Sequence, residues 1–114
     1  MKVIVENLAK ENIMSIFYYN SRYSIKNAIE TNIEFENYID DLVKNPYIGR
    51  YIPELSDKRF REIIYRKNRR SGYRIMYYIS DISDTIYVVS VLNCKQNFMQ
   101  FLKLHNYFNN YFNF

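Results

Sequence analysis

The sequence predicts an α+β domain with elements in the order β-α-α-β-β-β-α, in which a helical hairpin packs on a mainly antiparallel sheet. Apolar residues in the first half recur every three, four or seven positions, as they do on helices. The second half contains three runs rich in Ile, Val and Tyr that are separated by short polar turns. Because no internal repeat or linker interrupts the chain, its 114 residues are expected to form a single domain, residues 1–114.

The first half predicts one short strand and two helices. A strand is expected at residues 3–5, followed by a helix over residues 8–19 with Asn7 as its N-cap. Ser24 is the expected cap of the second helix, which ends where Asn45-Pro46 and Gly49 interrupt it. The predicted inner faces comprise Ala9, Ile13, Ile16, Phe17 and Asn20 on the first helix and Ile25, Ala28, Phe35, Ile39 and Leu42 on the second.

The second half predicts a three-stranded meander. Its strands are expected at residues 60–66, 73–80 and 85–92, with turns at residues 67–72 and 81–84. Residues 86–92 are almost continuously apolar, which predicts a central strand that is covered on both faces. A terminal helix is expected from the spacing of Phe98, Phe101, Leu102, His105 and Phe108.

Composition excludes several classes of protein. No apolar run approaches the roughly 20 residues of a membrane span, so no membrane association is expected. Residues 1–6 reach an acid after three apolar residues and lack the core of a secretory signal, which predicts a cytoplasmic protein. With one cysteine, Cys94, and one histidine, His105, the chain is expected to hold no disulfide, no metal and no cofactor.

Positive charge is concentrated in one segment. Residues 58–74 contain eight of the 16 basic residues and the single acid Glu62, a net charge of +7, whereas the rest carries −3 from eight bases and 11 acids. Such a block attracts phosphates, nucleic acid or an acidic protein. A solvated surface is the alternative interpretation, but arginine outnumbers lysine six to two, and guanidinium groups suit bidentate recognition of anions.

Five short motifs follow one another between residues 49 and 98. They read Gly-Arg at residues 49–50, Pro-Glu-Leu at 53–55, Phe-Arg-Glu-Ile at 60–63, Tyr-Arg-Ile-Met-Tyr at 73–77 and Val-Leu-Asn-Cys-Lys-Gln-Asn-Phe at 91–98. In this order and spacing they resemble the RelE/ParE superfamily of bacterial toxins from type II toxin–antitoxin systems, which includes plasmid stabilisation proteins. The resemblance implies a small toxin that halts growth when it is released from a cognate antitoxin. RelE-like members cleave ribosome-bound mRNA, and ParE-like members inhibit DNA gyrase.

The RelE-like alternative requires a particular set of residues. RNA cleavage needs a base for the 2′-hydroxyl, an acid for the leaving oxygen and positive charge on the phosphate. By resemblance, Arg74 supplies the charge with Arg61 beside it, and Glu54 is the candidate base. The acid is missing, because the last strand ends in Asn93, Cys94 and Lys95, none of which transfers a proton readily near neutrality.

The end of that strand favours the ParE-like alternative. Residues 92–98 resemble a ParE-type ending written His-Gly-Arg-Gln/Arg-Asp-Phe, although Asn93, Cys94, Lys95 and Asn97 depart from it. The expected function is therefore growth inhibition through a target such as DNA gyrase, with neutralisation by an antitoxin that carries an acidic, amphipathic segment. The residues expected to bind the target are Arg59, Arg61, Arg66, Lys67, Arg69, Arg70, Arg74 and Lys95.

Structural roles remain open for the same residues. Arg74 can equally pair with Glu62 across the hairpin, Glu54 can be a loop acid near Arg50, and Cys94 can be a small buried side chain. His105 is expected to pack rather than to catalyse. A third class of function, a non-toxic nucleic-acid-binding module, predicts binding to naked RNA or DNA that weakens steeply with salt.

Overall fold

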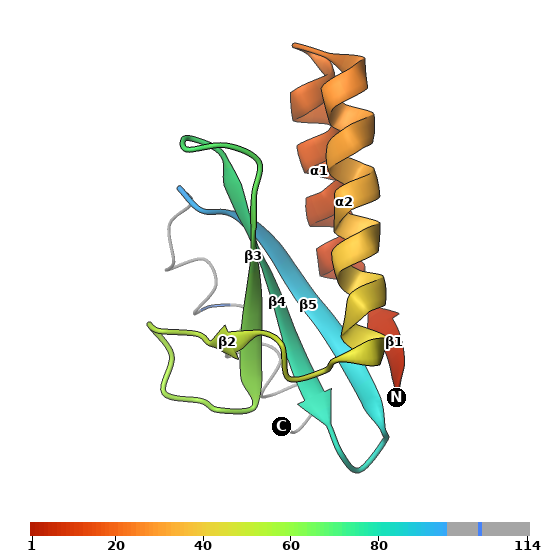
Figure 1. Cartoon of the computed structure of the whole chain (residues 1–114), viewed down its shortest axis with the longest axis vertical. Coiled ribbons are helices and arrows are strands. Elements are labelled where there is room, and N and C mark those ends of the chain that lie inside the picture. Colours follow the sequence, from red (N-terminus) through yellow and green to blue (C-terminus); the bar gives the residue numbers. More distant parts are fainter. Residues whose placement is uncertain (96–102, 104–114) are drawn as a thin grey trace.

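The computed structural model describes residues 1–95 and 103 and confirms the α+β class. Two helices, α1 (Asn7–Ser21) and α2 (Ile25–Lys44), form an antiparallel hairpin on one face of a five-stranded sheet (Figure 1). The strands lie in the order β1-β5-β4-β3-β2, and every pair except β1–β5 is antiparallel. The predicted terminal helix lies, apart from residue 103, outside the described residues.

The helical hairpin follows the predicted pattern with two corrections. Ser24 caps α2, because its Oγ accepts a hydrogen bond from the backbone N–H of Asn27 at 3.2 Å. Asn7 does not cap α1, since the helix starts one residue earlier than expected and Glu6 takes the N-cap position without a side-chain bond. Ile25 is 64% exposed instead of buried, because α2 begins at the end of the hairpin that reaches past the strands (Figure 1).

The meander is confirmed almost residue for residue. It consists of β3 (Phe60–Arg66), β4 (Gly72–Ser80) and β5 (Thr85–Asn93). β1 (Lys2–Val5) pairs in parallel with β5, so β5 lies between two strands, as its apolar sequence predicts. The sequence did not predict β2 (Arg50–Tyr51), which pairs with β3 through Arg50 and Glu62, because two residues are too few to show a strand period.

Both faces of the sheet contribute to the core. On the helix face, Phe35 of α2 packs edge-on against Tyr65 and Tyr73, at centroid distances of 5.9 and 5.1 Å. On the opposite face, which we call the open face, Met76 and Val89 form a second buried cluster with Phe60, Ile52 and Leu92. The side chains of β5 contribute to both clusters, with a register shift opposite Met76 and Tyr77, which confirms that this strand is covered on both sides.

The tyrosines of β4 lie on both faces of the sheet. Tyr73 and Tyr77 are buried on the helix face, whereas Tyr78 packs against the cluster on the open face. Within the described part of the chain, no helix has the length and apolar character needed to cross a membrane.

Candidate functional site: an arginine–carboxylate cluster on the open face

The two-residue period of β3 and β4 divides the basic segment between the faces of the sheet. Arg61 pairs in register with Tyr77, which is buried on the helix face. Glu62 pairs with Met76, and Arg74 pairs with Ile64, so both project to the open face. The expectation that Arg61 lies beside Arg74 is therefore wrong, because the two side chains leave opposite faces of the sheet.

A chain of four charged groups occupies the open face between β2 and β4. At its base lies Glu62, whose side chain is 0% exposed. One carboxylate oxygen of Glu62 accepts a hydrogen bond from Arg50 Nε at 2.9 Å, and the other accepts one from Arg74 Nε at 2.7 Å. A buried carboxylate is tolerated only when charged donors satisfy it, and two guanidinium groups do so here. The alternative in which Arg74 pairs with Glu62 is confirmed.

The outer edge of Arg74 holds a second carboxylate. Its Nη1 and Nη2 donate to the two carboxylate oxygens of Glu54 at 2.6 and 2.7 Å, a bidentate pair. All three guanidinium nitrogens of Arg74 are thus engaged, and its side chain is only 12% exposed. The hydrogen bonds that Arg74 donates lower the pKa of Glu54 below its ordinary value, and their acceptance by Glu54, followed by Glu62, raises the pKa of Arg74.

The lowered pKa of Glu54 predicts a pH-dependent stability. A carboxyl group whose folded pKa lies below its unfolded value stabilises the fold above that value and loses its contribution as pH falls through the folded pKa. We expect the advantage of the wild type over Glu54→Gln to be complete above the ordinary pKa of 4.5 and to shrink below it. Urea unfolding of both proteins across acidic pH measures the difference, and a pH-independent difference would contradict the ion pair.

A pocket of about 490 Å³ opens beside this cluster. Its walls comprise Arg50, Glu54, Ile64, Arg66, Arg74 and Cys94. Arg66 is exposed at the end of β3 and makes no ion pair with another described residue. The thiol of Cys94 is half-buried at the pocket and not fully buried as expected. The pocket therefore presents guanidinium groups with a small apolar floor.

Other members of the basic segment are held elsewhere. Arg61 lies over the rings of Tyr51 and Tyr47, at 4.4 and 5.2 Å from their centroids, and donates to the carbonyl oxygen of Gly49 at 2.8 Å. Arg59 forms a two-point contact with Asp57. These contacts are internal, so the basic segment does not form one continuous surface across the hairpin, and target binding by its residues stays a prediction.

The turn between β3 and β4 holds a further part of the basic segment. Lys67 reaches across to α2, where its Nζ donates to Thr31 Oγ1 at 2.9 Å and to the carbonyl oxygen of Asn27 at 3.3 Å. Asn68 Oδ1 accepts from two backbone N–H groups of the turn and so fixes its tip. The exposed guanidinium groups at this tip, which we call the basic tip, belong to Arg66, Arg69 and Arg70.

Lys95 is exposed at the end of β5, where its backbone N–H donates to Asn93 Oδ1 at 2.9 Å.

The sequence analysis placed Arg50 near Glu54 but missed the bond from Arg50 to Glu62. The feature of the sequence that could have indicated this bond is the Gly-Arg motif at residues 49–50, next to a proline-containing loop. Within the described residues, no three His, Cys, Asp or Glu side chains gather in an arrangement that could hold a metal ion.

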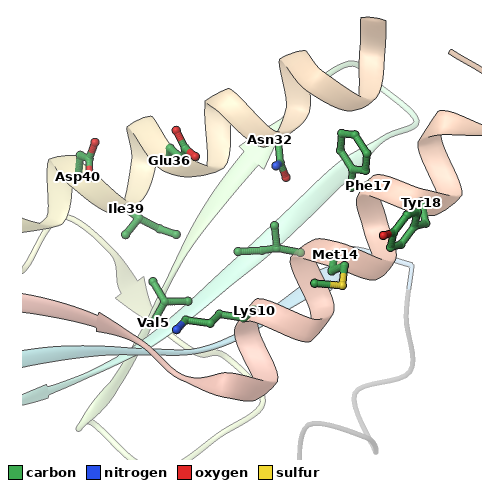
Figure 2. Close-up of a pocket in the computed structure, with 10 residues that line it drawn as sticks. Val5, Lys10, Met14, Phe17, Tyr18, Asn32, Glu36, Ile39 and Asp40 are labelled. Carbon is green, nitrogen blue, oxygen red and sulfur yellow. The ribbon is translucent and has the colours of Figure 1, made fainter. Parts of the chain in front are cut away.

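A second cavity, of about 500 Å³, lies between the two helices (Figure 2). Its labelled walls are Lys10, Met14, Phe17 and Tyr18 from α1, Asn32, Glu36, Ile39 and Asp40 from α2, and Val5 from β1 (Figure 2). The lining is mainly apolar, and Glu36 and Asp40 on α2 lie across from Lys10 on α1. A mainly apolar lining with a few charged groups is typical of a binding site.

A helical hairpin packed on one face of a mixed five-stranded sheet is consistent with a RelE/ParE-like fold. A sequence model of the family described as "ParE toxin of type II toxin-antitoxin system, parDE" matches residues 3–98. The chain belongs to this family of toxins. No curated protein matches it with significant similarity.

Proposed function

We propose that the protein arrests bacterial growth as a ParE-like toxin that binds an essential macromolecular target such as DNA gyrase, and that a cognate antitoxin neutralises it. Membership of the ParE toxin family supports this proposal over the other classes. Under the proposal the protein acts in the cytoplasm, where such a target and the antitoxin are found, and stabilises the plasmid or locus that encodes it.

The bidentate pair between Glu54 and Arg74 is the observation that favours a non-nucleolytic toxin. Glu54 is the candidate base of the ribonuclease alternative, yet both of its oxygens accept hydrogen bonds from Arg74, which lower its pKa. A carboxylate with a lowered pKa is a weak proton acceptor, and efficient general bases have pKa values closer to neutrality. A general acid is also lacking around Arg74 in the part of the chain that the structure describes, since the pocket side chains apart from Glu54 are arginines, Ile64 and Cys94.

The basic tip and the cavity between the two helices suggest how the antitoxin binds. The basic tip attracts acidic side chains, and the cavity between α1 and α2 accepts apolar ones. An amphipathic, acidic segment of the antitoxin satisfies both requirements. A small acidic protein encoded next to this chain is therefore expected to copurify with it.

Tightly controlled induction in a bacterial host tests the proposal. We expect growth arrest with intact transcripts, and the purified protein is expected to inhibit supercoiling by gyrase. The exposed variant Glu11→Gln serves as a control for expression and folding.

Other results would identify the alternatives. Cleaved ribosome-bound transcripts, together with loss of arrest in Glu54→Gln, would establish the ribonuclease, because removing a general base lowers such rates by about 10²- to 10⁴-fold. Unimpaired growth combined with salt-sensitive binding to naked nucleic acid would instead identify a non-toxic binding module.

A further inference from the structure

The two carboxylates on Arg74 are held in different ways. Glu62 projects from the middle of β3, is fully buried and is also bound by Arg50. Glu54 comes from the loop between β2 and β3, and its side chain is 37% exposed. Water can hydrate Glu54 if it leaves Arg74, but it cannot reach Glu62 without unfolding the sheet. The inner carboxylate is therefore structural, and the outer one is exchangeable.

Exchange at Arg74 costs little when one carboxylate replaces another. The outer Nη1 and Nη2 groups form two parallel donors, and Glu54 already fills them in bidentate geometry at 2.6 and 2.7 Å. An incoming carboxylate recovers both hydrogen bonds, so the net free energy depends on its other contacts. This geometry shows that the fork of Arg74, formed by Nη1 and Nη2, binds a carboxylate.

The pocket beside the fork adds charge and apolar surface. With Glu54 displaced, Glu62 is the one acidic side chain that the described part of the chain places against Arg50 and Arg74, and Arg66 adds a third guanidinium group, which leaves an excess of positive charge around the opening. Ile64 and Cys94 provide an apolar wall that a methylene stem can contact. Guanidinium groups bind carboxylate and phosphate alike, and the apolar wall favours a carboxylate on an aliphatic stem, whose methylene groups it can contact.

We propose that this pocket is an acceptor site for an aspartate or glutamate side chain of a partner protein, and that Glu54 is an internal competitor which the partner displaces. The proposal rests on the proposed function only in naming the partner, which is then the antitoxin. While the toxin is free, Glu54 accepts the outer hydrogen bonds of Arg74. A partner must displace Glu54 in order to bind, and a weakly acidic protein does not bind tightly enough to do so.

Binding of a synthetic acidic peptide to the full chain tests the proposal. The probe is a peptide of alternating Glu and Leu, and a single-stranded oligonucleotide of equal net charge is its counterpart. We expect Glu54→Gln to bind the peptide roughly tenfold more tightly than the wild type, because a bidentate competitor has been removed. Glu11→Gln changes the net charge equally and is expected to leave the affinity within about twofold, because a single distant surface charge is screened.

Equal gains for Glu54→Gln and Glu11→Gln would overturn the proposal, since bulk charge would then explain them. If Glu54→Gln gained affinity for the oligonucleotide and not for the peptide, the proposal of a carboxylate ligand would be wrong, and the site would bind phosphate instead. If Glu54→Gln does not fold, the wild type still decides the question: NMR should show the Glu54 carboxyl moving to an ordinary pKa when the peptide is added, and an unmoved pKa contradicts displacement. These measurements use no toxicity assay. Absence of growth arrest would therefore contradict the proposed function without affecting the result for the pocket.

Discussion

Replacing Glu62 with alanine is expected to lower the free energy of unfolding by about 3 kcal/mol, the cost of removing one partner from a buried ion pair. The variant leaves Arg74, whose side chain is 12% exposed, without its inner carboxylate, and it removes the bond from Arg50 of β2 to β3. The value lies at the low end of the usual range because Glu54 still neutralises Arg74 and Arg50 can turn to solvent. Urea denaturation at neutral pH measures the change.

Two comparisons isolate this effect. Glu62→Gln keeps the shape of the side chain and one acceptor but removes the charge. Its free energy of unfolding should therefore lie between those of the wild type and Glu62→Ala. The exposed Glu11→Ala should change stability by less than about 0.5 kcal/mol, as most surface substitutions do. If Glu62→Ala were as stable as Glu11→Ala, the cluster would have no role in holding β2 on the sheet.

Gly49→Ala should be nearly as damaging, with an expected loss of about 3 kcal/mol, the upper range for overpacking. A Cβ at this position would lie 2.5 Å from Tyr77 Oη and 2.8 Å from the backbone oxygen of Glu62. The Tyr77 hydroxyl cannot easily retreat, because it accepts from Gly49 N–H and donates to the carbonyl oxygen of Pro46 at 2.8 Å. Thermal unfolding and urea denaturation report the loss.

Gly72→Ala is the matched control, since Gly72 is also buried and next to the cluster. Its added Cβ would meet Cys94 Sγ at 3.1 Å and the backbone oxygen of Tyr65 at 3.3 Å, contacts that small adjustments relieve. We expect a loss of about 1 kcal/mol or less, because the entropic gain of replacing glycine partly offsets the crowding. A larger loss at Gly72 than at Gly49 would show that the contacts of Tyr77 are not the constraint.

Local periodicity was sufficient to predict most of the fold. The meander strands and the Ser24 cap are short-range features, and each appears within a few residues of its predicted place. The errors lie where local signals are weakest. Strand β2 has two residues, and its pairing with β3 depends on a partner 12 positions away. The exposure of Ile25 depends on how far α2 extends beyond the sheet, which an amphipathic pattern does not specify.

The candidate site was predictable only in part. The sequence located the basic segment, but treating it as one surface ignored the alternation of β3, which sends Arg61 and Glu62 to opposite faces. The bond between Arg74 and Glu62 was one of two alternatives left open. The contacts of Lys67 with Thr31 and of Glu54 with Arg74 join residues 36 and 20 positions apart, and no local pattern predicts them.

The parallel pairing of β1 with β5 affects the order in which the protein can be assembled. Lys2 lies beside Thr85 in the sheet, so β1 has no partner strand until β5 has left the ribosome. Contacts over such sequence distances also slow folding. A nascent chain therefore completes its sheet only after β5 has emerged, which leaves an interval for a partner to engage the helical hairpin before the sheet is complete.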